Sequence, residues 1–372
     1  MTKEGPAMKK NFATVMILIS ICSICIPGLY SDVAGQEKQS QRALKLTIAA
    51  GQPTTGIDYV YTAQHFFVPE VTKRLAAKSI KIEWNEAYGA SLAKVSEVLE
   101  STESGLTDIG VMNFAFEPTK LYLMNVCFFV PFNTPDAVLA TKVLRRIVDE
   151  TPEMVRIFEE KYNQKFLGWG SIGNYQLITK FPVTQMSDLK GKKIAAAGPN
   201  LPFLKGTGAV PVQSTIIDAY TSLQTGVYQG WLIPPSTGAG FKLHEVCKYV
   251  AKIDMGCAVV MGLTANLNTW KKLPKEVQDV LLAVAKDYEL EAAKTTMKSD
   301  ESGMKTYSES GVKVSEFSSE EKAKWALSLE NIPGAKAKEA DSMGLPGTKV
   351  LKAYLKYLEE GGYKLPRKWP IE

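Results

Sequence analysis

A helical pattern of unusual length in the last third of the chain constrains the fold most. Pro274 followed by acidic residues is a helix-start signal, and apolar residues recur at helical spacing from Val277 to Ala292. The pattern extends to Ser310, where Gly311 supplies a stop. A helix of this length would extend about 50 Å. Because that exceeds the width of one domain, we expect the helix to span two domains.

The rest of the chain alternates short β-like runs with helical stretches, which predicts an α/β fold. A chain of 372 residues is expected to hold about two domains at roughly 100–200 residues per domain. The predicted strands are residues 44–50, 80–84, 108–112, 165–169, 175–179, 193–196, 230–233, 249–253 and 258–264. Further helices are predicted over 60–76, 91–104, 135–162, 217–225 and 350–358, with surface helices between 318 and 344.

The N-terminus has the pattern of an export signal. Lys9 and Lys10 precede an apolar run of about 15 residues, and small residues at 33–35 form an acceptable cleavage site. We therefore predict a signal peptide over residues 1–35, with Met8 as a natural start, and a periplasmic location. The run is shorter than the ~20 residues that span a bilayer. An uncleaved membrane anchor is the alternative.

Composition and motifs argue against several classes of protein. Lysines and arginines number 44 against 39 acids, with no basic block, so nucleic acid is not an expected partner. The only histidines are His65 and His244, which leaves few general bases and no His-rich metal site. A Gly-x-Gly-x-x-Gly run over residues 168–173 is followed by a β-like segment, which favours a glycine-rich crossover between domains over a nucleotide site. We therefore expect no catalytic residue, metal or cofactor.

Three cysteines remain after the predicted signal peptide: Cys127, Cys247 and Cys257. An odd number permits at most one disulfide. A pair between Cys247 and Cys257 and three buried free thiols are both open alternatives.

Six sequence blocks in a fixed order resemble one family, the DctP-type substrate-binding proteins of TRAP (tripartite ATP-independent periplasmic) transporters. The blocks are residues 84–92, 97–110, 188–194, 208–211, 219–227 and 268–274. The resemblance covers residues 44–311, most of the predicted mature chain. It implies a two-lobed periplasmic-binding-protein-like fold (type II-like), a long helix bridging both lobes, two chain crossings between the lobes, and hinge closure around a ligand.

The resemblance also suggests where the lobes begin and end. We expect lobe I to comprise 44–170 plus about 258–295, lobe II to comprise 171–257 plus about 296–345, and a C-terminal helix and tail to occupy 346–372.

The ligand-binding positions implied by the resemblance depart from the family pattern. An arginine that usually follows Lys-Ile is replaced by Ala195, and a second arginine position is Tyr175. Lys242 and His244 are possible sources of positive charge, the alternative being a solvated helix face. The remaining candidates are aromatic or neutral and polar, at the loops where ligands meet open α/β sheets. They are Gln52, Thr55, Tyr88, Asn113, Phe114, Tyr175, Asn200, Phe203, Trp231 and Ser236.

These features together predict a periplasmic receptor that captures a small organic acid and delivers it to TRAP membrane permease subunits. With no arginine at the expected positions, we expect a monocarboxylate, with an aromatic or hydrophobic acid favoured. The alternatives are a ligand-binding subunit for a sensor kinase and a periplasmic enzyme on a binding-protein scaffold.

Overall fold

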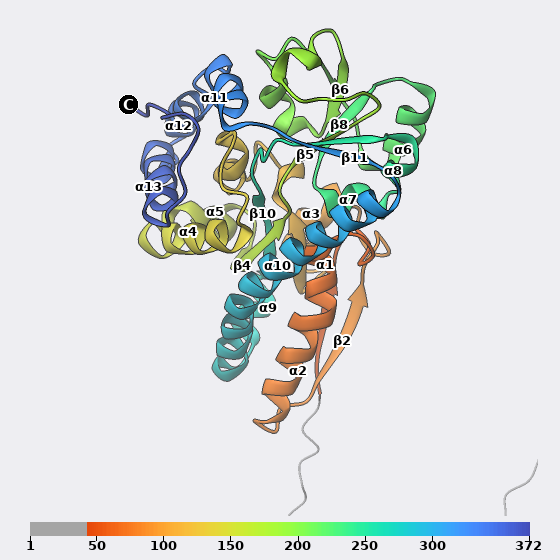
Figure 1. Cartoon of the computed structure of the whole chain (residues 1–372). Helices are drawn as coiled ribbons and strands as arrows, with labels where there is room; N and C mark the ends of the chain where they lie inside the picture. Colours follow the sequence, from red (N-terminus) through yellow and green to blue (C-terminus); the bar gives the residue numbers. More distant parts are fainter. Residues whose placement is uncertain (1–42) are drawn as a thin grey trace, which may run out of the picture. The chain divides into compact units, whose positions relative to one another are not determined.

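The computed structural model describes residues 43–372, and the predicted signal peptide lies outside the described residues. The described part holds two β-sheets surrounded by helices, as the sequence predicts for a two-lobed α/β fold (Figure 1). The first sheet has the order β2-β1-β3-β10-β4 and the second has the order β11-β9-β5-β8-β6-β7. The residue boundaries proposed for the two lobes remain a prediction.

The first sheet is formed by β1 (Leu44–Ala49), β2 (Ile82–Ala87), β3 (Ile109–Asn113), β4 (Gln164–Ile172) and β10 (Ala258–Asn266). In this sheet β1 is parallel to β2 and β3, whereas β10 is antiparallel to β3 and β4. The second sheet is formed by β5 (Gln176–Thr179), β6 (Lys193–Ala196), β7 (Val210–Gln213), β8 (Gly230–Ile233), β9 (Tyr249–Lys252) and β11 (Lys313–Glu316). Here β6, β7 and β8 are parallel, and β5 is antiparallel to β8 and β9.

All nine predicted strands are present, with ends that shift by at most three residues. The sequence missed β7 and β11, which lie at the two edges of the second sheet. Both have four residues, and most of their side chains are exposed or half-buried. The strand signal is weak because neither strand buries an apolar face.

The helices are α1 (Asp58–Thr62), α2 (Val68–Ala76), α3 (Val98–Ser104), α4 (Ala137–Glu150), α5 (Glu153–Lys161), α6 (Ile216–Thr225), α7 (Pro235–Gly240), α8 (Leu243–Val246), α9 (Leu267–Lys272), α10 (Lys275–Glu309), α11 (Ser319–Ser328), α12 (Ile332–Ser342) and α13 (Gly347–Glu360). A π-helical turn, η1 (Ala63–Phe67), joins α1 to α2. Short 3₁₀ segments are η2 (Val95–Glu97), η3 (Phe114–Phe116), η4 (Tyr122–Phe129), η5 (Met186–Leu189) and η6 (Gly198–Leu204). Among the described helices none combines the length and apolar character needed to cross a bilayer.

The long helix α10 contains 35 residues and contacts elements around both sheets. It packs against β4, α4 and α1 around the first sheet, and against α7 and β11 around the second (Figure 1). The expectation that one helix spans both lobes is therefore confirmed. Small residues permit this close packing: a Cβ atom at Gly168 would lie 2.9 Å from the carbonyl oxygen of Ala285.

The helix predicted over residues 135–162 is wrong in that the structure divides it in two. The pattern over 135–162 predicts one helix, whereas the chain forms α4 and α5 with a break at Thr151 and Pro152. Proline has no N–H for the helical hydrogen bond, and it disfavours helical geometry in the preceding residue. Thr151 accordingly has φ −138° and ψ 68°.

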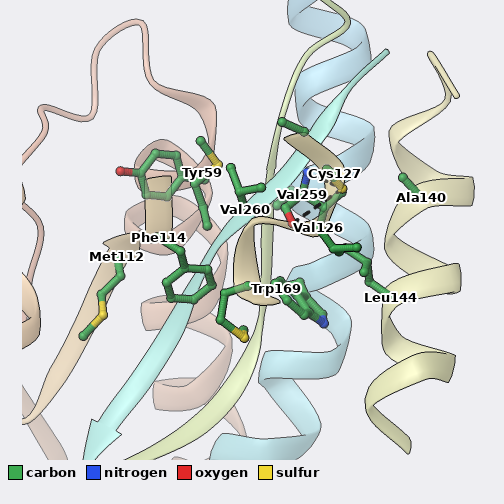
Figure 2. Packing of buried hydrophobic residues seen from close by; sticks show 14 of the residues in the cluster. Tyr59, Met112, Phe114, Val126, Cys127, Ala140, Leu144, Trp169, Val259 and Val260 are labelled. Carbon is green, nitrogen blue, oxygen red and sulfur yellow. Dashed lines mark hydrogen bonds between the residues drawn. The ribbon is translucent and has the colours of Figure 1, made fainter. Parts of the chain in front are cut away.

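The core beside the first sheet is rich in aromatic and aliphatic side chains (Figure 2). Phe114 lies edge-on to Trp169, with ring centroids 5.9 Å apart, and it also packs against Phe158. Cys127 accepts a hydrogen bond from the backbone N–H of Val259 at 3.4 Å. A separate apolar cluster covers one face of the second sheet, beneath α6, α8 and the end of α10.

Candidate ligand-binding site

Two short segments of the chain connect the two sheets. The chain passes from β4 to β5 through residues 173–175, and from β9 back to β10 through residues 253–257. The backbone N–H of Tyr175 donates to the carbonyl of Gly256 at 3.1 Å, so the two crossings lie side by side. By strand direction, the carboxyl ends of β1, β3, β6 and β8 lie on the edges that these crossings join. Ligands of open α/β sheets bind at such edges.

The glycine-rich run after the fourth strand belongs to this crossover. The segment that follows Gly173 leads into β5 rather than into a helix, so the favoured interpretation of a domain crossing holds. A Cβ at Gly173 would lie 2.0 Å from the carboxylate oxygen Oδ2 of Asp300. Glycine is therefore required where the crossing meets α10.

Four candidate residues follow strands of the first sheet. Gln52 accepts a hydrogen bond from the Tyr59 hydroxyl, and its carbonyl accepts one from Gly89 at 3.0 Å. The Tyr88 hydroxyl is buried beside the Glu86 carboxylate. Thr55 is exposed. The side-chain oxygen of Asn113 caps η3 by accepting from Ala115 at 3.1 Å, which leaves the amide nitrogen of Asn113 for another acceptor.

Four other candidates belong to the second sheet and the crossing. Tyr175 is nearly buried, and its ring lies edge-on to Phe128 with centroids 6.0 Å apart. Asn200 on η6 is fully buried, and neither atom of its amide has a partner in the described part of the chain. The Ser236 hydroxyl on α7 is also buried, and it lies beside the carboxylates of Asp58 and Asp300. Phe203 is buried too, and its carbonyl accepts from the Trp325 indole at 2.7 Å.

Two aromatic candidates lie in the core, which corrects the sequence prediction for them. The Phe114 ring is surrounded by Phe158, Phe166 and Trp169. Trp231 is 3% exposed and packs edge-on against Tyr228 within the second cluster. Alternate strand residues face opposite sides of a sheet, and Trp231 falls on the side covered by α6 and α8. Neither ring is therefore available as a pocket wall.

The sequence missed two carboxylates at the junction. Asp58 begins α1 and accepts a hydrogen bond from the Ser299 hydroxyl at 2.7 Å. Asp300 on α10 accepts from the backbone N–H groups of Asn174 at 2.8 Å and Ser236 at 3.1 Å. Burial raises the pKa of each carboxyl to about 6, and no lysine or arginine in residues 43–372 offsets either charge. Nothing in the local sequence links the two positions, so their proximity is visible only in three dimensions.

The residues considered for positive charge lie apart from this junction. Lys242 is exposed and lines a shallow hollow of about 410 Å³ with Tyr220, Phe241 and Glu245. His244 is half-buried against Tyr307, with ring centroids 6.0 Å apart, and burial lowers its pKa. Lys242 is therefore solvated, as the alternative expects, but it lies in the turn between α7 and α8 rather than on a helix face. Ala195, at an expected arginine position, is fully buried.

The three cysteines of the described chain are free and buried. Cys247 belongs to the cluster of the second sheet, whereas Cys257 belongs to the larger cluster together with Cys127. The alternative of buried free thiols is therefore confirmed, and the pair between Cys247 and Cys257 is absent.

Comparison with known proteins identifies relatives of the whole fold. The sequence profile of DctP, "Bacterial extracellular solute-binding protein, family 7", matches residues 59–335. The chain is 25% identical over 303 residues to the C4-dicarboxylate-binding periplasmic protein DctP of Rhodobacter capsulatus, covering 76% of this chain and 88% of that protein. It is 24% identical over 264 residues to a solute-binding protein of Albidiferax ferrireducens, covering 70% of this chain and 75% of that protein.

Solved structures share the architecture at low identity. A TRAP periplasmic solute-binding protein from Desulfovibrio salexigens superposes with a TM-score of 0.75 at 20% identity, covering 88% of this chain and 98% of that chain. A marine metagenome TRAP solute-binding protein specific for aromatic acid ligands, in complex with 3-hydroxybenzoate, gives 0.72 at 19% identity, with 86% and 98% covered. These similarities establish the two-lobed fold of solute-binding proteins.

Proposed function

Since this chain belongs to the DctP family of bacterial extracellular solute-binding proteins, we propose that it captures a small organic acid between its two sheets and delivers it to TRAP membrane permease subunits. The family and fold are those of substrate-binding receptors. The activity we infer is binding followed by closure of the lobes, without covalent chemistry.

One observation supports the location of the ligand more than any other. Both polar atoms of the Asn200 amide are buried without a partner in the described structure. Asn200 follows β6, whose carboxyl end lies on the edge that the crossings join. Leaving a buried polar group unpaired costs about 1–3 kcal/mol. A ligand that hydrogen-bonds this amide would offset that cost.

The charges of the junction favour a monocarboxylate. Burying two carboxylates of a ligand costs several kcal/mol per ion unless each is paired. Tyr175 and Ala195 provide no cation, and Asp58 and Asp300 add negative charge nearby. One ligand carboxylate can still accept hydrogen bonds from Asn200 and from hydroxyl groups.

Related proteins bind organic acids of several classes, monoacids among them. Solved TRAP receptors similar to this chain were crystallised with 3-hydroxybenzoate, with benzoate (Rhodoferax ferrireducens) and with pyroglutamic acid (Bordetella pertussis). The curated relative from Rhodobacter capsulatus is named for C4-dicarboxylates. We favour an aromatic or hydrophobic monoacid because Tyr175 borders the junction and because Lys322, whose ammonium lies at the crossings, is already paired with Asp254.

A thermal-shift screen followed by calorimetric titration tests the ligand class. Benzoate, 3-hydroxybenzoate, pyroglutamate, succinate and malate form a suitable panel, because a ligand that binds only the folded state raises Tm. We expect a monoacid to bind. Binding of succinate or malate with the monoacids silent would overturn the monocarboxylate assignment, and silence of all five acids would overturn the assignment of an organic acid as the ligand.

Export and delivery need their own experiments. Intact-mass measurement of protein recovered from the periplasm should show loss of about 35 N-terminal residues, and retention of residues 1–35 would favour the membrane-anchor alternative. Adjacent genes for a small and a large membrane protein would support the permease partners, whereas an adjacent sensor-kinase gene would favour the signalling alternative.

A further inference from the structure

Asp254 connects the two chain crossings through its side chain and backbone. Its carboxylate oxygen Oδ1 accepts hydrogen bonds from Asn174 Nδ2 at 2.8 Å and from Gln176 Nε2 at 2.9 Å. The backbone N–H of Asp254 donates to Gln176 Oε1 at 3.0 Å. Asp254 therefore holds the residues on both sides of Tyr175, the candidate ligand residue of the first crossing.

Backbone hydrogen bonds complete this network. Tyr175 donates its N–H to Gly256 and accepts from the N–H of Met255, each at 3.1 Å. Gly256 also donates to Asn174 Oδ1 at 3.1 Å. Asp254 adopts φ +49°, in the left-handed region that aspartate adopts more readily than most residues with a Cβ. The surrounding contacts hold Asp254 in this backbone conformation.

A lysine from the C-terminal part of the chain binds the same carboxylate. Lys322 Nζ on α11 lies 2.6 Å from Asp254 Oδ2, and the two side chains are 21% and 29% exposed. This pair, together with Gln176, holds the pKa of Asp254 below its usual value despite burial. The carboxylate therefore stays ionised and keeps all of its hydrogen bonds at neutral pH.

The helix that carries Lys322 contacts elements on both sides of the crossings. The Trp325 ring lies edge-on to Phe132, which precedes α4, with ring centroids 5.7 Å apart. The Trp325 indole donates to the carbonyl of Phe203 at 2.7 Å, and Glu321 accepts from the backbone N–H of Met186 at 2.8 Å. A change in the angle between the two sheets must alter the backbone of the crossings, because the crossings join the sheets and so form the hinge. Lys322 binds this hinge to α11 through its ion pair with Asp254.

We propose that Asp254 and Lys322 form a positioning pair for the ligand site: Asp254 fixes the backbone that presents Tyr175, and Lys322 limits how far the two lobes rotate about the crossings. The inference rests on the proposed function, because presentation of Tyr175 matters only if a ligand binds at the junction. Neither residue touches the ligand itself. Loss of the pair broadens the range of lobe orientations and weakens binding without unfolding the protein.

The orientation of the lobes can be measured without a ligand. Spin labels on Lys45→Cys in β1 and Lys193→Cys in β6 report the distance between the sheets, since both positions are exposed and the three described native thiols are buried. We expect Lys322→Ala to broaden or shift the distance distribution, and Lys322→Arg to restore it. Lys324→Ala is the matched control, because Lys324 lies on the same helix and pairs with Glu321 on the surface. An unchanged distribution in Lys322→Ala, with native circular dichroism, overturns the positioning pair.

Binding gives the second measurement. With 3-hydroxybenzoate as the probe, we expect Lys322→Ala and Asp254→Asn to raise Kd by about five- to tenfold, as loss of a partly buried ion pair implies, while Lys324→Ala stays within about twofold. A parallel loss of Tm that accounts for the whole change in Kd would assign the pair a purely structural role. If no acid of the panel binds the unmutated protein, the ligand proposal fails, whereas the distance distributions still decide the inference.

Discussion

The guanidinium of Arg145 on α4 binds the carboxylate of Glu289 on α10, with Nε 3.0 Å from Oε2. The same carboxylate accepts a hydrogen bond from the backbone N–H of Trp169 at 2.8 Å. The Glu289 side chain is 3% exposed, so this ion pair fixes the long helix to the first sheet through a buried charge. A Cβ at Gly168 would lie 3.2 Å from this carboxylate. Strand β4 can approach Glu289 this closely because glycine has no side chain.

Removal of one partner of this pair should destabilise the fold. Arg145→Ala leaves the Glu289 carboxylate buried and unpaired, which is expected to cost about 3–5 kcal/mol in the free energy of unfolding. Urea denaturation measures the loss. Arg146→Ala is the neighbouring control, because Arg146 pairs with Glu150 and Glu360 at the surface and should cost at most about 1 kcal/mol. Equal losses for the two variants would contradict the assignment.

Trp231 is expected to contribute to stability rather than to ligand binding. Trp231→Ala removes a ring packed between Tyr228 and the residues of the second cluster, at a cost of about 3–5 kcal/mol. Calorimetric titration of the variant, at a temperature where it remains folded, should give an unchanged Kd for the ligand. A weakened Kd with full stability would return Trp231 to the pocket.

Asn200 should behave in the opposite way. Asn200→Leu replaces an unpaired buried amide by an apolar group of similar volume, so the free energy of unfolding should stay the same or rise. Affinity for the ligand should fall about tenfold or more, as expected when a hydrogen bond to a charged group is lost. Denaturation and calorimetry measure the two effects.

Asn266 provides the matched control for that experiment. It is also buried, but its amide donates to the carbonyls of Thr102 and Glu103 and its oxygen caps α9. Asn266→Leu is therefore expected to lose about 1–3 kcal/mol of stability. A comparable loss in Asn200→Leu would show that the Asn200 amide has partners in solution.

Asp58 should give stability a dependence on pH with a defined sign. Its pKa is about 6 in the folded protein against 3.8 as the ordinary value, because burial disfavours the charge. The folded state therefore binds the proton more tightly, and stability from this group is present below pH 3.8 and lost as the pH rises through 6. Asp58→Asn should be more stable than the unmutated protein by about 3 kcal/mol at pH 7.5.

The same comparison at low pH supplies the control. At pH 4 the difference between Asp58→Asn and the unmutated protein should shrink, because Asp58 is then protonated in the folded state. Asparagine can still accept the hydrogen bond from Ser299, so the variant changes charge with little change in contacts. A difference that is independent of pH would show that the Asp58 carboxyl is not perturbed by burial.

The sequence by itself determined the elements, because their signals are local. Pro274 and Gly311 mark the ends of the long helix, and Gly226 adopts φ +80° where it ends α6 before β8. Short buried strands were readable from their apolar runs, whereas β7 and β11 were not, because their side chains face solvent at the sheet edges. The order of six sequence blocks supplied the family, and with it the two lobes.

The tertiary structure alone decided which candidates surround the junction. Trp231 and Ser236 lie within a few residues of each other in the sequence. In the structure the Trp231 side chain on β8 lies in the core, whereas the Ser236 side chain on α7 lies at the crossings. Asp58 and Asp300 are 242 positions apart and come together only because α1 packs on α10. Side-chain burial and pairing depend on contacts between distant segments, and no local pattern in the chain encodes those contacts.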